Sequence, residues 1–294
     1  MIRLRAFLYS NQKVRVVPVR KTVAGNPGAR NGKMTKAIKR LDWSVVLLCA
    51  ALFGFGCQTV EYTGRTQVNL IPESDEKKLG VDAYQDILKK TPLSQNQAWQ
   101  AQLKGVGQRI SSAAAKPDYQ WEFNVLQGNE VNAFCLPGGR VAFWEGIMPV
   151  AQDDNGIAVV MGHEVAHALA HHGAERMTQS MGAAVIGEIL SAGIGKVNPA
   201  YSEAFAQAYG LGTNVAVILP WGRAQESEAD HIGLILMAKA GYDPSAAVTF
   251  WERMSKIQQG GTPPVYLSTH PSDETRIAQI KKWLPEAMTY YNKK

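Results

Sequence analysis

The residues with the clearest capacity for chemistry are two histidines and a glutamate in one short motif. His163, Glu164 and His167 form HExxH within an Ala/Val-rich segment that predicts a helix. Residues four apart on a helix differ by about 40° of rotation and about 6 Å of rise. Both imidazoles therefore face the same way and can bind one metal ion. Glu164 lies beside that ion, where it can take a proton from a metal-bound water. The alternative is a solvated helix face that carries two histidines.

A second acidic segment offers the missing ligand. Glu226, Glu228 and Asp230 lie in another helical pattern, 59 or more residues after the first motif. Glu226 and Asp230 share one face, whereas Glu228 is rotated by about 200° from Glu226. The two glutamates therefore cannot both face the metal, and periodicity alone does not choose between them.

The elements that must position these residues are mostly helical. Apolar spacing and turn signals predict helices at about 74–90, beginning at Ser74 as N-cap, and at about 95–115. Alternating runs, with Pro-Gly-Gly at 137–139 as a turn, predict strands at 120–126, 131–136 and 140–144. The chain is mostly helical from residue 153 onward. We therefore expect an α+β fold with a small antiparallel β-sheet or hairpin next to the HExxH helix.

The charge of the chain is concentrated at its N-terminus. The formal net charge is +6, yet residues 1–40 carry 11 Lys/Arg and no acidic residue, and residues 57–294 carry a net charge of −4. The body of the protein is therefore mildly acidic. A basic nucleic-acid-binding face is not expected, and we predict no nucleic-acid partner.

The N-terminal segment is typical of targeting. A basic stretch precedes a 14-residue apolar run, which is shorter than the ~20 residues of a membrane span. The run ends in Gly56-Cys57, which resembles the lipobox of bacterial lipoproteins and makes Cys57 a lipidation candidate; a plain cleaved signal and a retained anchor are the alternatives. We predict a signal peptide at 34–56 that starts at Met34, with residues 1–33 a mis-assigned or extended N-terminus.

The rest of the chain is expected to form one domain. Residues 57–74 lack helical periodicity and are predicted to be a tether, followed by a single domain at 75–294. The chain has three cysteines, which excludes a disulfide-stapled scaffold. Cys135 is expected to be a buried thiol. The apolar stretch at 181–194, together with residues 201–212, is expected to cover the cleft as helices or as a mobile lid.

Several motifs together resemble a known family. HExxH followed by Glu226-x-x-x-Asp230 is similar to the gluzincin zinc metalloproteases of the BepA, LoiP, HtpX and Oma kind, which include the CAAX prenyl proteases. Further matches lie at 131–139 (VNAFCLPGG), 145–147 (EGI), 163–177 (HEVAHALAHHGAERM) and 268–271 (STHP). The resemblance implies a zincin-type metalloprotease of the exported, lipoprotein-like branch without a helical-repeat domain.

The resemblance also implies roles for single residues. His163, His167 and Glu226 would bind one Zn²⁺ per chain, and Glu164 would be the general base. Asp230 would hold His163 or His167 by its free ring nitrogen, as chemistry also requires. His270 is a gate or fourth-ligand candidate; alternatively it caps the next helix.

The implied function is zinc-dependent endopeptidase activity in envelope protein quality control. A substrate strand would pair with the edge strand at Asn132, Ala133 and Phe134, which favours unfolded or misassembled envelope proteins. Gln58 and Thr59 after the candidate lipidation site favour the periplasmic side of a bacterial outer membrane. There are two rival functions. One is a membrane-anchored chaperone or assembly factor with a latent protease site, and the other is a small-molecule or prenyl-peptide metallohydrolase.

Overall fold

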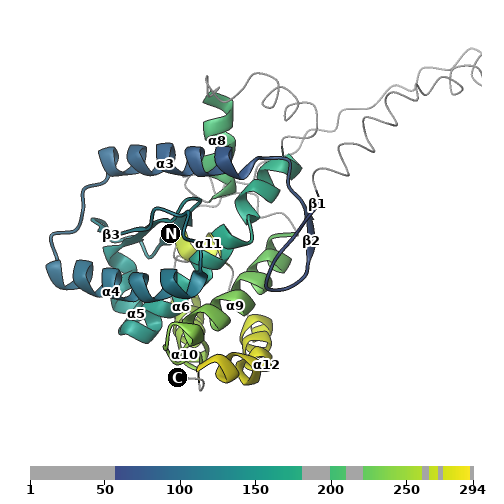
Figure 1. The fold of residues 1–294 in the computed structure, drawn as a ribbon. Coiled ribbons are helices and arrows are strands. Elements are labelled where there is room, and N and C mark those ends of the chain that lie inside the picture. The colour runs from purple at the N-terminus through teal and green to yellow at the C-terminus, as the bar shows by residue number, and fades with distance from the viewer. Residues whose placement is uncertain (1–56, 181–198, 210–220, 260–264, 271–273, 292–294) are drawn as a thin grey trace, which may run out of the picture. The chain divides into compact units, whose positions relative to one another are not determined.

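The computed structural model describes residues 57–180, 199–209, 221–259, 265–270 and 274–291. The chain divides into two compact units, Met1–Ala50 and Ala51–Lys294, and all described residues belong to the second unit (Figure 1). The expectations for residues 1–33, for the signal peptide at 34–56 and for the cover at 181–194 lie outside the described residues.

Two helices precede the sheet. Helix α3 spans Glu73–Lys90, preceded by Pro72, and no side chain caps it, so the prediction of Ser74 as N-cap is wrong. Helix α4 spans Gln97–Ala114 and begins after Asn96, whose side chain accepts a hydrogen bond from the Trp99 N–H. The buried face of α4 includes Leu103, Val106 and Ile110.

The sheet has three strands and is mixed. Strands β3 (Glu122–Leu126), β4 (Ala133–Leu136) and β5 (Arg140–Trp144) lie in the order β3-β5-β4. The predicted hairpin is confirmed: β4 and β5 are antiparallel, and Gly138 and Gly139 in their turn have φ angles of 85° and 86°. The third strand differs from the expected antiparallel pairing. The chain runs from β3 to the edge strand β4 before β5 returns between them, so β5 is parallel to β3.

The HExxH segment lies at the centre of the domain. After the short helices η2 (Glu145–Ile147) and α5 (Met148–Ala151), helix α6 spans Asp154–Leu169. Asp153 caps it by accepting a hydrogen bond from the Gly156 N–H at 2.8 Å. Every residue from 156 to 168 is buried, which explains why small and apolar residues fill the segment.

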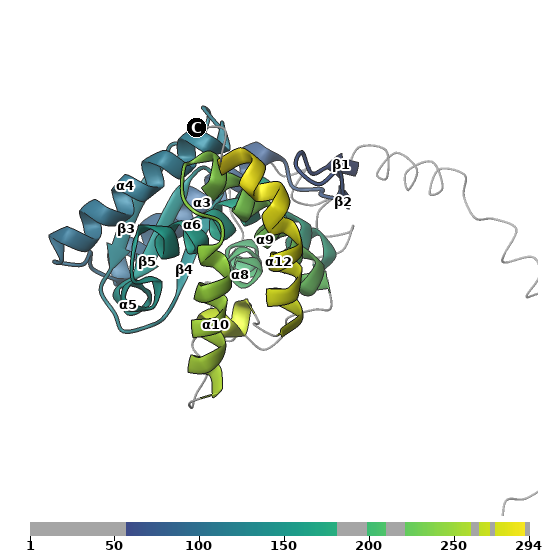
Figure 2. The same cartoon turned by 90° about the horizontal axis from the view of Figure 1, so that it is seen from below.

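Helices form the remainder of the domain. They are residues 172–180, α8 (Pro199–Ala208), α9 (Trp221–Lys239), α10 (Ala246–Gln259), α11 (Val265–Thr269) and α12 (Glu274–Tyr291). Helix α9 packs against both α6 and α12, and Figure 2 shows α9 beside α12. The expectation of a mostly helical α+β fold is confirmed. Among the described helices, none has both the length and the hydropathy that crossing a bilayer requires.

The segment expected to be a tether is structured in part. Strands β1 (Cys57–Thr59) and β2 (Thr66–Val68) pair antiparallel; we call residues 57–68 the N-terminal hairpin. Within it Val60 and Gln67 are buried, and Gln67 Nε2 donates to the Ala170 carbonyl at 2.9 Å. The hairpin therefore packs on the end of the HExxH helix, where free chain was expected.

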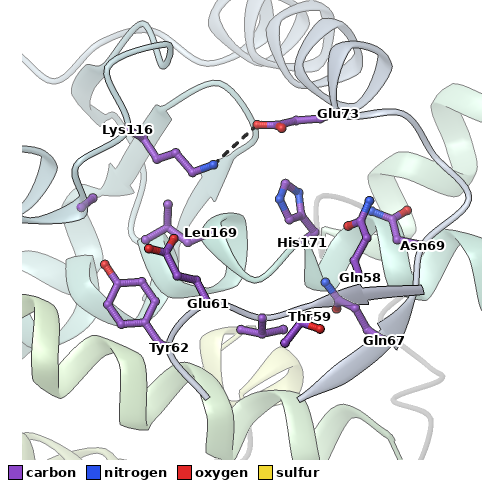
Figure 3. A pocket seen from close by; sticks show the side chains of 12 residues that line it. Gln58, Thr59, Glu61, Tyr62, Gln67, Asn69, Glu73, Lys116, Leu169 and His171 are labelled. Carbon is purple, nitrogen blue, oxygen red and sulfur yellow. Dashed lines mark ion pairs between the residues drawn. The ribbon is translucent and has the colours of Figure 1, made fainter. Parts of the chain in front are cut away.

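A polar cavity lies between part of the N-terminal hairpin and the rest of the domain. It has a volume of about 360 Å³ and is drawn in Figure 3. Glu61 and Gln67 of the hairpin line one side, and His171, which follows α6, lies across from them. Lys116 and Glu73 form an ion pair at its edge, 3.8 Å apart. The hairpin and the turn after α6 thus border the same polar cavity.

Candidate metal centre

Four side chains from three helices converge on one point. His163 and His167 come from α6, Glu226 from α9, and His270 follows α11. All four are buried, and one potential ligand atom of each lies within 4.8 Å of the others. His163 Nε2 lies 3.1 Å from both His167 Nε2 and His270 Nδ1. Glu226 Oε2 lies 2.8 Å from His270 Nδ1 and 3.2 Å from His163 Nε2.

The spacing of these atoms fits tetrahedral coordination of a metal cation. Zinc bonds of about 2.0–2.1 Å place ligand atoms about 3.3 Å apart, which is close to the separations here. Glu226 Oε1 is fully buried and accepts no hydrogen bond from the residues that the structure describes, although His167 Nε2 lies 3.3 Å away. Nitrogen lone pairs and carboxylate oxygens that face each other at such distances repel unless a proton or a metal cation lies between them. The donor set therefore suits a divalent metal such as zinc.

Asp230 orients one of the two helix histidines. Its Oδ1 lies 2.9 Å from His163 Nδ1, which leaves His163 Nε2 to face the metal position. Arg276 from α12 donates to both Asp230 oxygens, at 2.7 and 2.8 Å, and its guanidinium lies 3.4 Å from the centre of the Trp251 ring. Arg223, three residues before Glu226, is exposed, and Arg276 is the arginine that holds Asp230.

The electrostatics of the cluster favour positive charge. Burial opposes protonation of His163, but hydrogen bonds to Asp230 and Glu226 outweigh it and raise its pKa to about 9. Burial alone would raise the pKa of Glu226, yet the charges of His270 and His167 hold it well below its usual range. Glu226 thus stays ionised in a buried position, as a metal ligand must.

Glu164 lies beside the four convergent atoms. Its Oε1 accepts a hydrogen bond from Tyr266 Oη at 2.9 Å and lies 3.6 Å from His270 Nε2. Burial, and then the charge of Glu164, raise the pKa of Tyr266 well above its usual value, so this hydroxyl stays a donor. Glu164 therefore lies next to the metal position, with one oxygen held by Tyr266.

The structure separates the two glutamates that periodicity could not. Glu226 lies in the cluster of ligand atoms, whereas Glu228 Oε2 lies 2.9 Å from His172 Nε2 and accepts from Arg65 Nε at 2.6 Å. Glu228 therefore lies outside the group of convergent ligand atoms. Hydrogen bonds to His172, Thr63 and Arg65 outweigh burial and lower its pKa to about 2.

The predicted substrate-binding residues line the same small cavity as the site. Asn132, Ala133 and Phe134 border it together with Glu164, His167 and His270, and its volume is about 30 Å³. Ala208 and Tyr209, at the end of α8, form part of its wall. Strand β4 is an edge strand of the described sheet, as expected for strand addition.

Other described cysteines and histidines do not belong to the group of convergent ligand atoms. Cys135 is buried, as predicted, and Cys57 is exposed at the start of β1. His171 Nδ1 lies 2.7 Å from Glu76 Oε2. His231 lies 2.7 Å from a carboxylate oxygen of Glu286 on α12.

Sequence reasoning missed Arg276 and Tyr266 and gave His172 no specific role. Tyr266 and Arg276 are separated from HExxH by about a hundred residues and belong to no motif with it, so only the fold brings them together. A signal existed for Arg276, because it lies six residues after His270 at the start of an amphipathic helix.

Comparisons with known proteins agree with this geometry. The family model described as peptidase family M48 matches residues 97–284. The mitochondrial metalloendopeptidase OMA1 of Schizosaccharomyces pombe is 34% identical over 256 residues, which cover 85% of this chain and 74% of the relative. The OMA1 protein of Saccharomyces cerevisiae is 30% identical, covering 85% and 78%. The β-barrel assembly-enhancing protease of Escherichia coli is 25% identical over 79% of this chain and 48% of its own length.

The comparisons correct one expectation. The sequence favoured the periplasmic side of a bacterial outer membrane, but relatives from fungi, a plant and vertebrates that match this chain are mitochondrial proteins by name. The prediction of a bacterial outer-membrane lipoprotein is therefore wrong. It rested on two residues after Cys57, which do not determine a compartment.

The family assignment rests on two independent findings. The matching model covers more than half of the chain and includes every side chain of the metal cluster. The two yeast relatives are 34% and 30% identical to this chain, and both alignments cover 85% of it. The chain therefore belongs to peptidase family M48 and is a metalloendopeptidase.

Proposed function

We propose that the protein is a zinc-dependent endopeptidase in which His163, His167 and Glu226 hold the ion. The observation that carries this proposal is the convergence of their buried ligand atoms beside Glu164. Two imidazoles and one carboxylate form the ligand set of known catalytic zinc sites. When bound there, zinc would lower the pKa of a water molecule and polarise the scissile carbonyl.

The protein's own residues would handle the protons. Glu164 takes a proton from the attacking water and delivers it to the leaving amine. Tyr266 donates a hydrogen bond to Glu164 and so fixes the orientation of the carboxylate. Asp230, held by Arg276, keeps the His163 ring in the tautomer that leaves Nε2 free.

His270 is proposed as a gate. Its Nδ1 lies 2.8 Å from Glu226 Oε2, so it would serve as a fourth protein ligand when the ion is bound. Four protein ligands are typical of structural zinc sites, whereas catalytic sites keep one position open. A swing of His270 out of this position would open the site for water and substrate.

The proposed substrates are extended segments of unfolded or misassembled proteins. In the register of the hairpin, the backbone N–H and C=O groups of Asn132 and Phe134 point toward β5. The backbone groups of Ala133 and Cys135 therefore point to the outer edge of the sheet. A substrate strand paired there would lie along the wall that Glu164 shares. The Escherichia coli relative, named for β-barrel assembly, supports a role in protein quality control.

Membrane attachment through a lipid on Cys57 is also retained as a proposal, since Cys57 is exposed. The intact mass of the mature chain tests it directly. A mature chain that retains residues before Cys57, or lacks the added mass of acyl chains, would exclude it.

Cleavage of an unfolded protein tests the proposed function. We expect the wild-type chain to cleave reduced, alkylated casein, and a zinc chelator to abolish the cleavage until zinc is restored. Glu164→Gln should lower kcat by about 10²–10⁴-fold, the contribution of a general base, with the bound metal retained. If Glu164→Gln also retains the cellular role of the protein, the rival chaperone function gains the support instead.

A further inference from the structure

The second helix histidine has an orienting partner of its own. His167 Nδ1 lies 2.8 Å from His172 Nδ1, and His172 Nε2 lies 2.9 Å from Glu228 Oε2. His172 is fully buried and Glu228 is 7% exposed, so water does not replace these contacts. The three side chains therefore form a continuous row that leads away from the metal position.

Only one arrangement of protons fits this row. His167 presents Nε2 to the other ligand atoms, so its Nδ1 carries the hydrogen and donates it to His172. His172 Nδ1 then acts as acceptor, and its hydrogen resides on Nε2, which donates to the Glu228 carboxylate. A carboxylate only accepts hydrogen bonds, so Glu228 sets the direction of the entire row.

The N-terminal hairpin holds the far end of the row. Arg65 Nε donates to Glu228 at 2.6 Å, and the Thr63 hydroxyl donates to the other carboxylate oxygen. The two terminal nitrogens of Arg65 donate to Glu175 at 3.0 Å each. The Glu228 carboxylate is therefore fixed from the hairpin side as well as from the His172 side.

His163 and His167 differ in whether a carboxylate contacts the ring Nδ1 directly or through another side chain. Asp230 contacts His163 directly, while the nearest carboxylate on the Nδ1 side of His167 is that of Glu228, with His172 between them. We propose that His172 is the positioning residue for His167 and that Glu228 supplies the charge that fixes its tautomer. The proposal rests on the proposed zinc site, because it assigns a role toward one of its ligands.

Zinc affinity of the full chain, measured by competition with a chromophoric chelator, tests this relay. Loss of an outer partner of a ligating histidine typically weakens binding 10–100-fold, so His172→Leu and Glu228→Gln should each raise the zinc Kd by that factor. In His172→Asn the side-chain oxygen replaces the acceptor, and the Kd should rise less than tenfold. The double variant His172→Leu/Glu228→Gln should bind no more weakly than the worse single variant, because both break one row.

His231→Asn is the matched control, since His231 pairs with Glu286 outside the row, and its zinc Kd should equal that of the wild type. Circular dichroism of each metal-free variant separates weak binding from loss of the fold. If His172→Leu does not fold, the near-isosteric Glu228→Gln decides. An unchanged zinc Kd in either folded variant would overturn the relay while leaving the zinc site intact, whereas a wild-type chain that binds no zinc would overturn the proposed function and the relay with it.

Discussion

Arg276 holds the two buried carboxylates of the site, Asp230 and Glu226. It is buried, donates to both oxygens of Asp230, and lies 3.6 Å from Glu226 Oε2. The Trp251 ring covers its guanidinium and excludes water. Burial would lower the pKa of Arg276, but the charge of Asp230 more than offsets this, and in turn the Arg276 charge lowers the pKa of Asp230.

Arg276→Met should destabilise the protein strongly. Removing one partner of a buried ion pair leaves an uncompensated charge and typically costs about 3–5 kcal/mol. Lys281→Met is the control on the same helix, because Lys281 and Glu252 are about half exposed and 4.0 Å apart, and it should change the free energy of unfolding by less than about 1 kcal/mol. Urea denaturation measures the free energy of unfolding of both variants. Equal losses in the two variants would show that the buried Arg276–Asp230 pair contributes no more to stability than an exposed pair.

At the residue scale, the sequence predicted the site residues that lie together in one short motif. HExxH fixes its own geometry through helical periodicity, so His163, Glu164 and His167 were predictable. The choice between Glu226 and Glu228 needed either a family resemblance or the fold, since both lie on one buried helix. Arg276 was missed because its partner lies 46 residues away in the sequence.

At the scale of elements, the crossing of α6 and α9 brings the ligands together. Gly162 and Gly233 meet where the helices touch: a Cβ on Gly162 would lie 2.8 Å from the Gly233 carbonyl oxygen. Only glycine allows this backbone approach. His163, next to Gly162, and Asp230, one turn before Gly233, are thereby placed in contact.

Gly162→Ala should therefore separate the two helices. Overpacking at such a contact costs about 1–3 kcal/mol, and the shift should also raise the zinc Kd, because the two helices carry the ligands. Gly105→Ala in α4 is the matched control: no atom lies within 4 Å of its added Cβ, so up to about 1 kcal/mol of stabilisation is expected. Thermal unfolding with and without zinc compares them, and a Gly162→Ala protein as stable as the wild type would refute this role of the crossing.

His171 gives the turn after α6 a pH dependence. Burial opposes its charge, but the hydrogen bond to Glu76 prevails and raises its pKa. Because the pKa of His171 is raised on folding, the charged His171–Glu76 pair stabilises the folded state. This stabilisation is complete below the pKa of His171 in the unfolded chain, about 6.5, and is lost as the pH rises through its pKa in the folded protein. His171→Asn tolerates the φ of 53° at this position. Its loss of stability relative to the wild type should be larger at pH 6 than at pH 9.5; an equal loss at both pH values would contradict the assignment.

Elements were predictable where their pairing is local. The turn glycines at 138 and 139 specified the β4–β5 hairpin directly. The parallel pairing of β3 with β5 depends on contacts across a crossover, which alternation within one strand does not encode. The N-terminal hairpin was missed for a related reason, since its strands have three residues each and are held by Gln67 and Arg65 contacts to distant helices.

At the scale of the whole molecule, the ligands and their supports come from almost the entire described unit. HExxH lies near its middle, Arg276 in the last helix, and Arg65 in the first hairpin. The chain covers 74% and 78% of the two yeast relatives, so the likeness extends across most of their length. A metal site assembled from such distant segments couples metal binding to folding of the unit.

The metal content of the purified protein tests the central claim most directly. Elemental mass spectrometry of the wild type, Glu164→Gln and Glu226→Gln compares a proposed base with a proposed ligand on the same site. We predict about one zinc per chain in the wild type and in Glu164→Gln, and a loss of zinc in Glu226→Gln. A correctly folded wild type without zinc, or a Glu226→Gln protein that keeps it in full, would contradict the account.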